Sequence, residues 1–146
     1  MRKVILVGVL AAFGSATLAV TAFGSFDHHF TVFEKARFHV LQNQEVFTIR
    51  GGLYDPRNHA DRVGSDHARC KIRPHETLRC RGVIHLNGEI GGGSGDIKYR
   101  GNVSPHDSRL NVTGGSGDFN GVAGKWVFKN VNESGTKSLN RFSLIR

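Results

Sequence analysis

The sequence predicts an all-β protein, an eight-stranded antiparallel β-barrel, from its composition, its short apolar runs and its regularly spaced turns. Glycine accounts for 19 of the 146 residues and phenylalanine for 10, whereas proline accounts for only 3. Glycine disfavours helices and aromatic residues favour strands, so this composition suits a turn-rich β-domain. Turn residues recur every 8–15 residues and no helical apolar stripe persists between them. This spacing is typical of a sandwich or an antiparallel barrel.

The apolar runs give the order of the predicted strands. They cover residues 30–38, 46–49, 63–72, 78–86, 97–99, 110–112, 122–131 and 139–145. Eight antiparallel strands can close into a barrel, which removes the exposed edges of a sheet. Asn87-Gly88 lies between Leu86 and Ile90 and matches a type I′ turn, so we expect a tight hairpin at this point.

The N-terminal segment has the three parts of a secretory signal peptide. A positive start is followed by an uncharged, mostly apolar stretch, and Val20-Thr21-Ala22 offers small residues at a cleavage site. The alternative is an uncleaved membrane anchor, but an apolar run of about 17 residues is near the lower limit for crossing a bilayer. We therefore predict a secreted or extracytoplasmic protein, cleaved near Ala22. Its predicted parts are a signal peptide (1–22), a flexible leader (23–29) and a β-barrel domain (30–146).

The chain is basic, with a formal net charge of +8 at pH 7. Cleavage would remove Arg2 and Lys3 but no acidic residue, which leaves +6 on 124 residues. A secreted protein rarely meets nucleic acid, so we expect no nucleic-acid partner and favour an anionic glycan or a lipid surface. The glycine-rich segments match neither a phosphate-binding loop nor a dinucleotide fingerprint, because Phe119 and Asn120 occupy positions that require glycine.

The two cysteines, Cys70 and Cys80, lie close together in the sequence. In an oxidising compartment this pair predicts a disulfide. Closing a loop of about 11 residues should stabilise the fold by about 2.8 kcal/mol. A metal site or a reactive thiol is the alternative, but no ligand-spaced set of histidines surrounds the pair. We expect no metal and no other cofactor.

Pairing Cys70 with Cys80 fixes the register of an antiparallel hairpin. Ile72 then faces Leu78, and this apolar side should point inward because side chains alternate along a strand. The outward face opposes like charges directly, which destabilises a sheet unless solvent screens them. The alternative to simple screening is an anion-binding strip for a glycan, a phosphate or a lipid. The strip consists of two opposed pairs, Arg69 with Arg81 and Lys71 with Arg79.

One glycine-rich segment, Leu110-Asn-Val-Thr-Gly-Gly-Ser-Gly-Asp-Phe-Asn-Gly-Val-Ala-Gly-Lys125, resembles a hallmark of the dirigent and allene oxide cyclase barrel superfamily. In that superfamily an apolar strand leads into Gly-Gly-Thr-Gly, an aromatic residue and a small-residue stretch before the next strand. Residues 46–55 and 63–66 resemble its early strand and loop. The cysteine pair resembles that of secreted bacterial members. The resemblance covers residues 30–146 and implies an allene oxide cyclase/dirigent-like barrel with an apolar cavity, often trimeric.

The resemblance also implies where a ligand would lie. Aromatic side chains would line the cavity, and dirigent proteins often carry a cavity acid at the turn occupied by Asp118. Asp118 could equally cap the amides of its own turn. The expected ligand-binding residues are Tyr54, Tyr99, Asp118 and Trp126.

The sequence departs from the superfamily at two charged positions. Ala123 stands where the family has arginine, and Arg50-Gly51-Gly52 stands where the family has an acidic pair. A general acid or a cation would therefore come from elsewhere in the chain. The candidates are Glu34, Tyr54, Asp55, Tyr99 and Arg100.

Three functions remain open, and the first is favoured: a secreted dirigent-like barrel that binds a small apolar or aromatic ligand and steers its reactivity. The alternatives are an envelope or glycan interaction protein that uses the basic hairpin face, and an allene oxide cyclase-type isomerase without metal. A cavity would favour a ligand-binding function, and a buried carboxylate with a raised pKa would favour the isomerase. We expect a binding protein rather than an enzyme, and a homo-oligomer, either a dimer or a trimer.

Overall fold

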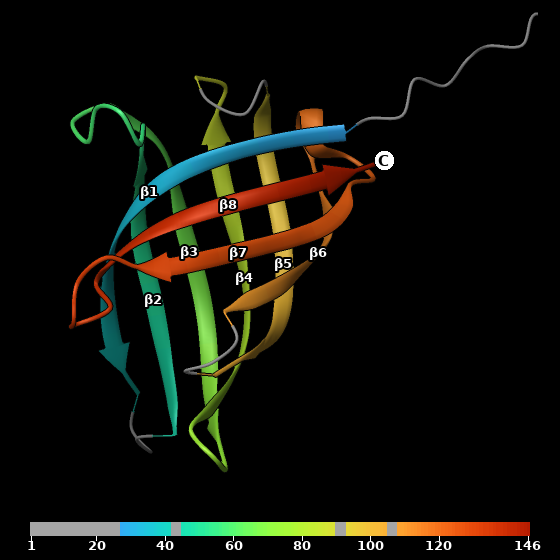
Figure 1. Cartoon of the computed structure of the whole chain (residues 1–146). Coiled ribbons are helices and arrows are strands. Elements are labelled where there is room, and N and C mark those ends of the chain that lie inside the picture. The colour runs from blue at the N-terminus through green and yellow to red at the C-terminus, as the bar shows by residue number, and fades with distance from the viewer. Residues whose placement is uncertain (1–26, 42–44, 90–92, 105–107) are drawn as a thin grey trace, which may run out of the picture.

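The computed structural model describes residues 27–41, 45–89, 93–104 and 108–146. Eight strands form one closed antiparallel barrel in which each strand pairs with its neighbours in sequence and β1 pairs with β8 (Figure 1). The predicted eight-stranded antiparallel barrel is therefore confirmed. The elements are β1 (Asp27–Val40), β2 (Val46–Tyr54), β3 (Arg62–Arg73), β4 (Thr77–Asn87), β5 (Ser94–Val103), β6 (Arg109–Gly115), the 3₁₀ turn η1 (Gly117–Phe119), β7 (Ala123–Asn130) and β8 (Lys137–Ile145). Among these described residues, no helix has the length and apolar character needed to span a membrane.

The first strand starts earlier than the sequence predicts. Asp27 pairs with Ile145 and His28 with Leu144, so residues 27–29 belong to the barrel rather than to a leader. Residues 1–26 lie outside the described part of the chain, and the signal peptide with its cleavage near Ala22 remains a prediction.

The connection between β4 and β5 is longer than predicted. Asn87 pairs with Ser94, so the connection runs from residue 88 to residue 93. The prediction of a tight type I′ turn at Asn87-Gly88 is therefore wrong. Side-chain bonds hold both ends of this loop. The Asn87 side chain accepts a hydrogen bond from the Glu89 amide, and the Asp118 carboxylate accepts one from the Ser94 amide.

The interior of the barrel is packed at one end and hollow at the other. The packed end lies where β1 begins and η1 covers the strands, and its buried side chains include Phe30, Val32, Leu86, Ile97, Phe119, Phe142 and Leu144. Phe30 stacks on Phe142 with ring centroids 4.7 Å apart, and Phe142 stacks on Trp126 at 5.4 Å. Because burial of each large apolar side chain contributes about 1.5–3 kcal/mol, this end supplies most of the core stabilisation.

The disulfide joins two residues that face each other across β3 and β4. Cys70 and Cys80 are bonded, with their Cα atoms 4.1 Å apart. The predicted register is confirmed, and both cysteines are buried on the inward face. Ile72, expected inside, is instead 45% exposed. The reason is that the β3–β4 hairpin continues past β2: the pairing of β2 with β3 ends at Val46 and Lys71, one residue before Ile72 (Figure 1).

Candidate functional site: a hollow barrel end with two buried carboxyl groups

The hollow end of the barrel contains a cavity of about 830 Å³. It extends to the end at which the β1–β2, β3–β4, β5–β6 and β7–β8 connections lie, since residues from these regions line it. Its walls are mostly apolar and include Phe47, Ile49, Ala68, Leu110 and Phe128. A cavity of this size and character suits a small molecule.

Two carboxyl groups lie at the inner limit of this cavity, where it meets the packed end. Glu34 on β1 and Asp66 on β3 both line the cavity, and their exposed fractions are only 5% and 2%. Side chains point alternately inward and outward along a strand. Glu34 lies two residues after the buried Val32 on β1 and therefore points inward as well.

A chain of hydrogen bonds holds Glu34. Its Oε2 atom accepts from Ser138 Oγ at 3.3 Å and from Asn140 Nδ2 at 3.2 Å. Asn140 in turn accepts a 2.9 Å hydrogen bond from the indole N–H of Trp126. Asn140 is fully buried, so this network fixes the orientation of the Glu34 carboxyl group from the interior of the barrel.

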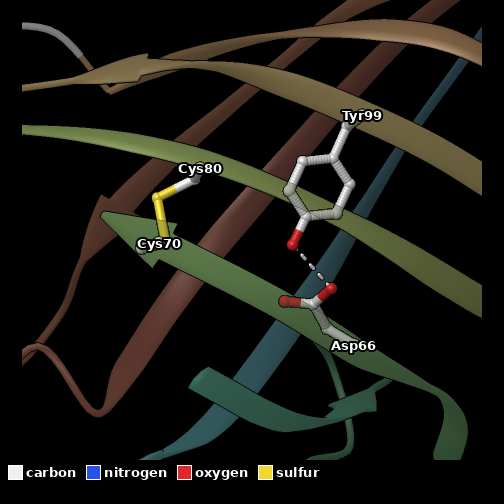
Figure 2. Close-up of a disulfide and its surroundings, with 4 residues drawn as sticks. All are labelled: Asp66, Cys70, Cys80 and Tyr99. Atoms are coloured by element: carbon white, nitrogen blue, oxygen red, sulfur yellow. Dashed lines mark hydrogen bonds between the residues drawn. A yellow bond between two sulfur atoms is a disulfide. The ribbon is translucent and has the colours of Figure 1, made fainter. Parts of the chain in front are cut away.

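Asp66 is held from the other side of the barrel. The Tyr99 hydroxyl on β5 donates a 2.8 Å hydrogen bond to Asp66 Oδ1. Figure 2 shows this hydroxyl turned toward the carboxylate, with Cys70 further along the strand that carries Asp66. The second oxygen of Glu34, Oε1, has no donor among the described residues. The Asp66 carboxyl group lies within hydrogen-bonding reach of Glu34, so a single proton between the two groups would provide the missing hydrogen bond.

Burial raises the pKa of both carboxyl groups. For Glu34, desolvation raises the pKa, and the hydrogen bonds from Ser138 and Asn140 oppose the rise. For Asp66, desolvation and then the neighbouring Glu34 charge hold the pKa well above its usual range, against the Tyr99 hydrogen bond. Burial also raises the pKa of Tyr99, so its hydroxyl stays a neutral donor. Both carboxyl groups therefore keep their protons to a higher pH than exposed carboxyl groups do, because burial and their mutual proximity disfavour two negative charges here.

Two glycines make room for these groups. A Cβ atom at Gly51 would overlap the Glu34 carboxyl group, and one at Gly82 would overlap the Tyr99 hydroxyl and ring. Gly82 lies on β4, directly between Ala68 of β3 and Tyr99 of β5. Its missing side chain lets Tyr99 cross the strand and reach Asp66.

The structure brings three of the residues proposed from the sequence into the cavity wall: Tyr99, Trp126 and Glu34. Tyr54 lies on the outer surface instead, where Lys35 Nζ is 4.4 Å from the centre of its ring. It is absent from the cavity wall because β2 presents Leu53 and Gly51 inward at this point.

The remaining candidates also lie outside the cavity. Asp118 is exposed at the packed end, and its carboxylate accepts a 2.8 Å hydrogen bond from the Ser94 amide at the start of β5 rather than from its own turn. Asp55 accepts a 2.7 Å hydrogen bond from the Arg57 amide in the β2–β3 connection. Arg100 is exposed on the outer face of β5. The four cations predicted as an anion-binding strip, Arg69, Lys71, Arg79 and Arg81, are all exposed on the outer face of the β3–β4 hairpin.

Sequence reasoning missed Asp66, Ser138 and Asn140 as site residues. A signal for Asp66 was present, because it lies two and four residues from Ala68 and Cys70 and so shares the inward face. Nothing comparable marks Ser138 and Asn140, whose inward direction depends on how β8 closes against β1.

Over the residues that the structure describes, no group of three or more His, Cys, Asp or Glu side chains is arranged to hold a metal ion. The carboxyl pair is accompanied by a phenol, an amide and an indole, and Glu76, Lys129 and Arg141 also line the cavity.

Comparison with known proteins identifies the fold. The sequence matches no known protein family and no curated protein. Among solved structures, the pterocarpan synthase dirigent protein GePTS1 is similar with a TM-score of 0.64 and 12% identity, covering 93% of this chain and 97% of that chain. Pyocyanin demethylase is similar with a TM-score of 0.60 and 19% identity (80% and 98% covered). The Diels-Alderase AbmU from Streptomyces koyangensis has a TM-score of 0.60 and 12% identity (81% and 68% covered). The predicted dirigent- and cyclase-like barrel is confirmed at the level of the fold.

Proposed function

We propose that this barrel binds one small apolar or aromatic ligand in its cavity and steers the reactivity of that ligand by proton transfer. The observation that carries the proposal is the buried Glu34–Asp66 pair, which lies at the inner limit of an apolar cavity and whose pKa values burial raises. A cavity supports ligand binding. Buried carboxyl groups with raised pKa values support acid–base chemistry, so the isomerase alternative gains over simple binding.

The cavity wall indicates the character of the ligand. Phe47, Phe128 and Trp126 offer aromatic surfaces. The polar lining comprises the carboxyl pair with its hydrogen-bond partners and, separately, charged side chains that include Glu76, Lys129 and Arg141. A pair that shares one proton carries a negative charge, so it disfavours an anionic ligand. We therefore expect a neutral ligand with one polar edge, which would hold a hydroxyl or carbonyl group against Glu34 and Asp66.

The pair can both give and take a proton. Asp66 in its protonated form can donate to a ligand oxygen, and Glu34 as a carboxylate can accept a proton from an acidic C–H or O–H group. Together these transfers would promote a tautomerisation or a cyclisation, in which no electrons leave the ligand and water is excluded. The names of similar barrels agree with small-molecule chemistry of this kind, since they include a pterocarpan synthase dirigent protein and a cyclase that catalyses a [4 + 2] cycloaddition.

The disulfide supports an oxidising, extracytoplasmic location for this activity. A secreted two-cysteine barrel, as the sequence suggests, would meet its ligand outside the cytoplasm.

Trp126 provides the test, because it is the only tryptophan and lies in the cavity wall. We expect the neutral fluorescent probe N-phenyl-1-naphthylamine to bind saturably and to quench Trp126 emission. Ala68→Phe would fill the cavity and abolish binding. Ala123→Phe, on the exposed outer face of β7, adds the same side chain and should leave binding intact. Binding that survives Ala68→Phe with the fold retained would contradict the proposal. Native mass spectrometry of the protein from its own host would then identify a carried ligand.

A further inference from the structure

The outer surface of the barrel carries a feature that the cavity does not use. Seven cations occupy outward positions on four adjacent strands, and we call this surface the basic face. They are Arg50 on β2, Arg69 and Lys71 on β3, Arg79 and Arg81 on β4, and Lys98 and Arg100 on β5. The sequence predicted only the two central strands of this face. The neighbouring strands β2 and β5 extend it: Arg81 pairs with Arg100 of β5 as well as with Arg69.

The basic face contains almost no compensating charge. Among the described residues, Glu45 is the one carboxylate within ion-pair distance of it, with its Oε2 atom 3.8 Å from Lys71 Nζ at the edge. Three arginines therefore stand side by side in the Arg69–Arg81–Arg100 row. Like charges at opposed positions on neighbouring strands destabilise a sheet, and a bound polyanion would reverse the sign of this effect.

The basic face is also hollowed. A shallow depression of about 470 Å³ lies between its rows of side chains, and Ala68 and Gly82 contribute to its floor. Cations stand around it on all four strands: Arg50, Arg69, Arg81 and Lys98. The long side chains thus surround a concave space, a geometry suited to an acid group that several guanidinium groups hold at once.

We propose that the basic face is a binding site for an anionic polysaccharide, with one acid group in the depression and others along the Arg69–Arg81–Arg100 row. From β2 to β5 the face spans about 14 Å, and cations on one strand repeat at about 6.8 Å. Charges spread at this spacing suit a chain with an acid group on successive sugars. The proposal is independent of the cavity, whose wall includes none of the seven cations.

Two other polyanions fit the face less well. Within the described part of the chain, the large apolar side chains exposed near these cations are Val83, at 37%, and Ile72 beside Lys71, at 45%, so only a small apolar area could insert into a lipid bilayer. Among the described residues no Phe, Tyr or Trp side chain is exposed there for stacking on the bases of a single-stranded nucleic acid, and the depression offers only the smaller imidazole ring of His67.

The test measures binding of fluorescein-labelled heparin oligosaccharide by the full-length protein at low salt. Arg69→Gln, Arg81→Gln and Arg100→Gln together should weaken binding by about tenfold or more, because three charge-assisted contacts are lost. The matched control combines Arg57→Gln, Lys125→Gln and Lys137→Gln, exposed cations outside the basic face and the cavity wall, and removes the same charge. The control should bind nearly as tightly as the unmodified protein.

Equal losses in the two triple variants would assign binding to net charge and overturn the proposal. Stronger saturable binding to phosphatidylglycerol vesicles or to duplex DNA than to heparin, lost in the same face variant, would also overturn it. Both triple variants should keep the Trp126 emission and the cavity binding of N-phenyl-1-naphthylamine, which separates failure of this site from failure of the cavity. Arg81→Gln alone gives a second, milder variant, and an affinity unchanged by it would count against the site.

Discussion

The Tyr99 hydroxyl donates a 2.8 Å hydrogen bond to Asp66 Oδ1 across a full intervening strand. The bond exists because Gly82 of that strand has no side chain. One backbone position on β4 thus controls the contact between a phenol on β5 and a carboxyl group on β3.

Gly82→Ala tests this relationship. The added methyl group would displace Tyr99 and break its bond to Asp66, and we expect the free energy of unfolding to fall by about 1–3 kcal/mol. Tyr99→Phe removes the hydroxyl alone and should cost about 1 kcal/mol. Urea denaturation of the single and double variants measures both effects. If the two losses simply add in the double variant, Gly82 and the Tyr99 hydroxyl are not coupled as the structure indicates.

Asp66→Asn should change how stability depends on pH. The folded state raises the pKa of Glu34 and Asp66, so it binds protons more tightly than the unfolded chain. The stability that this provides is fully present below the ordinary carboxyl pKa, and it is lost as pH rises through the raised values. Asp66→Asn removes one of these groups while it keeps an acceptor for Tyr99. Relative to the unmodified protein, it should therefore be more stable at about pH 8 than at about pH 5. Glu133→Gln, at an exposed position, is the control, and parallel pH profiles for Asp66→Asn and the unmodified protein would contradict the expectation.

The acid–base competence of the carboxyl pair can be measured without its natural ligand. 5-Nitrobenzisoxazole is a small, planar, neutral aromatic compound. Loss of its C–H proton to a carboxylate breaks the N–O bond and releases a coloured phenolate. We expect the protein to accelerate this reaction, with a rate that rises with pH as the pair loses its shared proton. Glu34→Gln with Asp66→Asn, and separately Ala68→Phe, should return the absorbance change to the background rate. Acceleration that survives both changes would place the chemistry elsewhere.

The disulfide should contribute to stability through the loop that it closes. Replacing Cys70 and Cys80 together by serine should lower the free energy of unfolding by about 2–3 kcal/mol, as expected for a loop of about 11 residues. Denaturation of the double variant, with the reduced unmodified protein as a comparison, gives the value. A change well below 1 kcal/mol would mean that the neighbouring strands already fix this hairpin.

Local sequence patterns predicted the barrel and one hairpin in detail. The cysteine pair set the register of β3 and β4, because two bonded residues facing each other fix every other pair on the hairpin. The prediction of a tight turn at Asn87-Gly88 was wrong. The chain forms a longer loop there, and Asp118, more than twenty residues away in the sequence, holds one end of it.

The site was only partly predictable for a related reason. Glu34, Tyr99 and Trp126 were candidates from residue type and family resemblance. Asn140 reaches Glu34 only because β8 closes the barrel against β1. Asp66 reaches Tyr99 across β4, which depends on the missing side chain of Gly82. Tyr54 has the same residue type as Tyr99, but the pleat of β2 turns it outward.

The split of the barrel into a packed end and a hollow end has a consequence for evolution and for engineering. The stacked rings of Phe30, Phe142 and Trp126 hold the ring of strands together from one side. Replacements toward the opposite side, at positions such as Ala36, Phe47 or Val103, remove little of that packing. Substitutions can therefore change the residues that line the cavity, and so the small molecule that it binds, while the fold is retained. Such divergence also fits barrels of the same shape that keep only 12–19% of their residues in common with this chain.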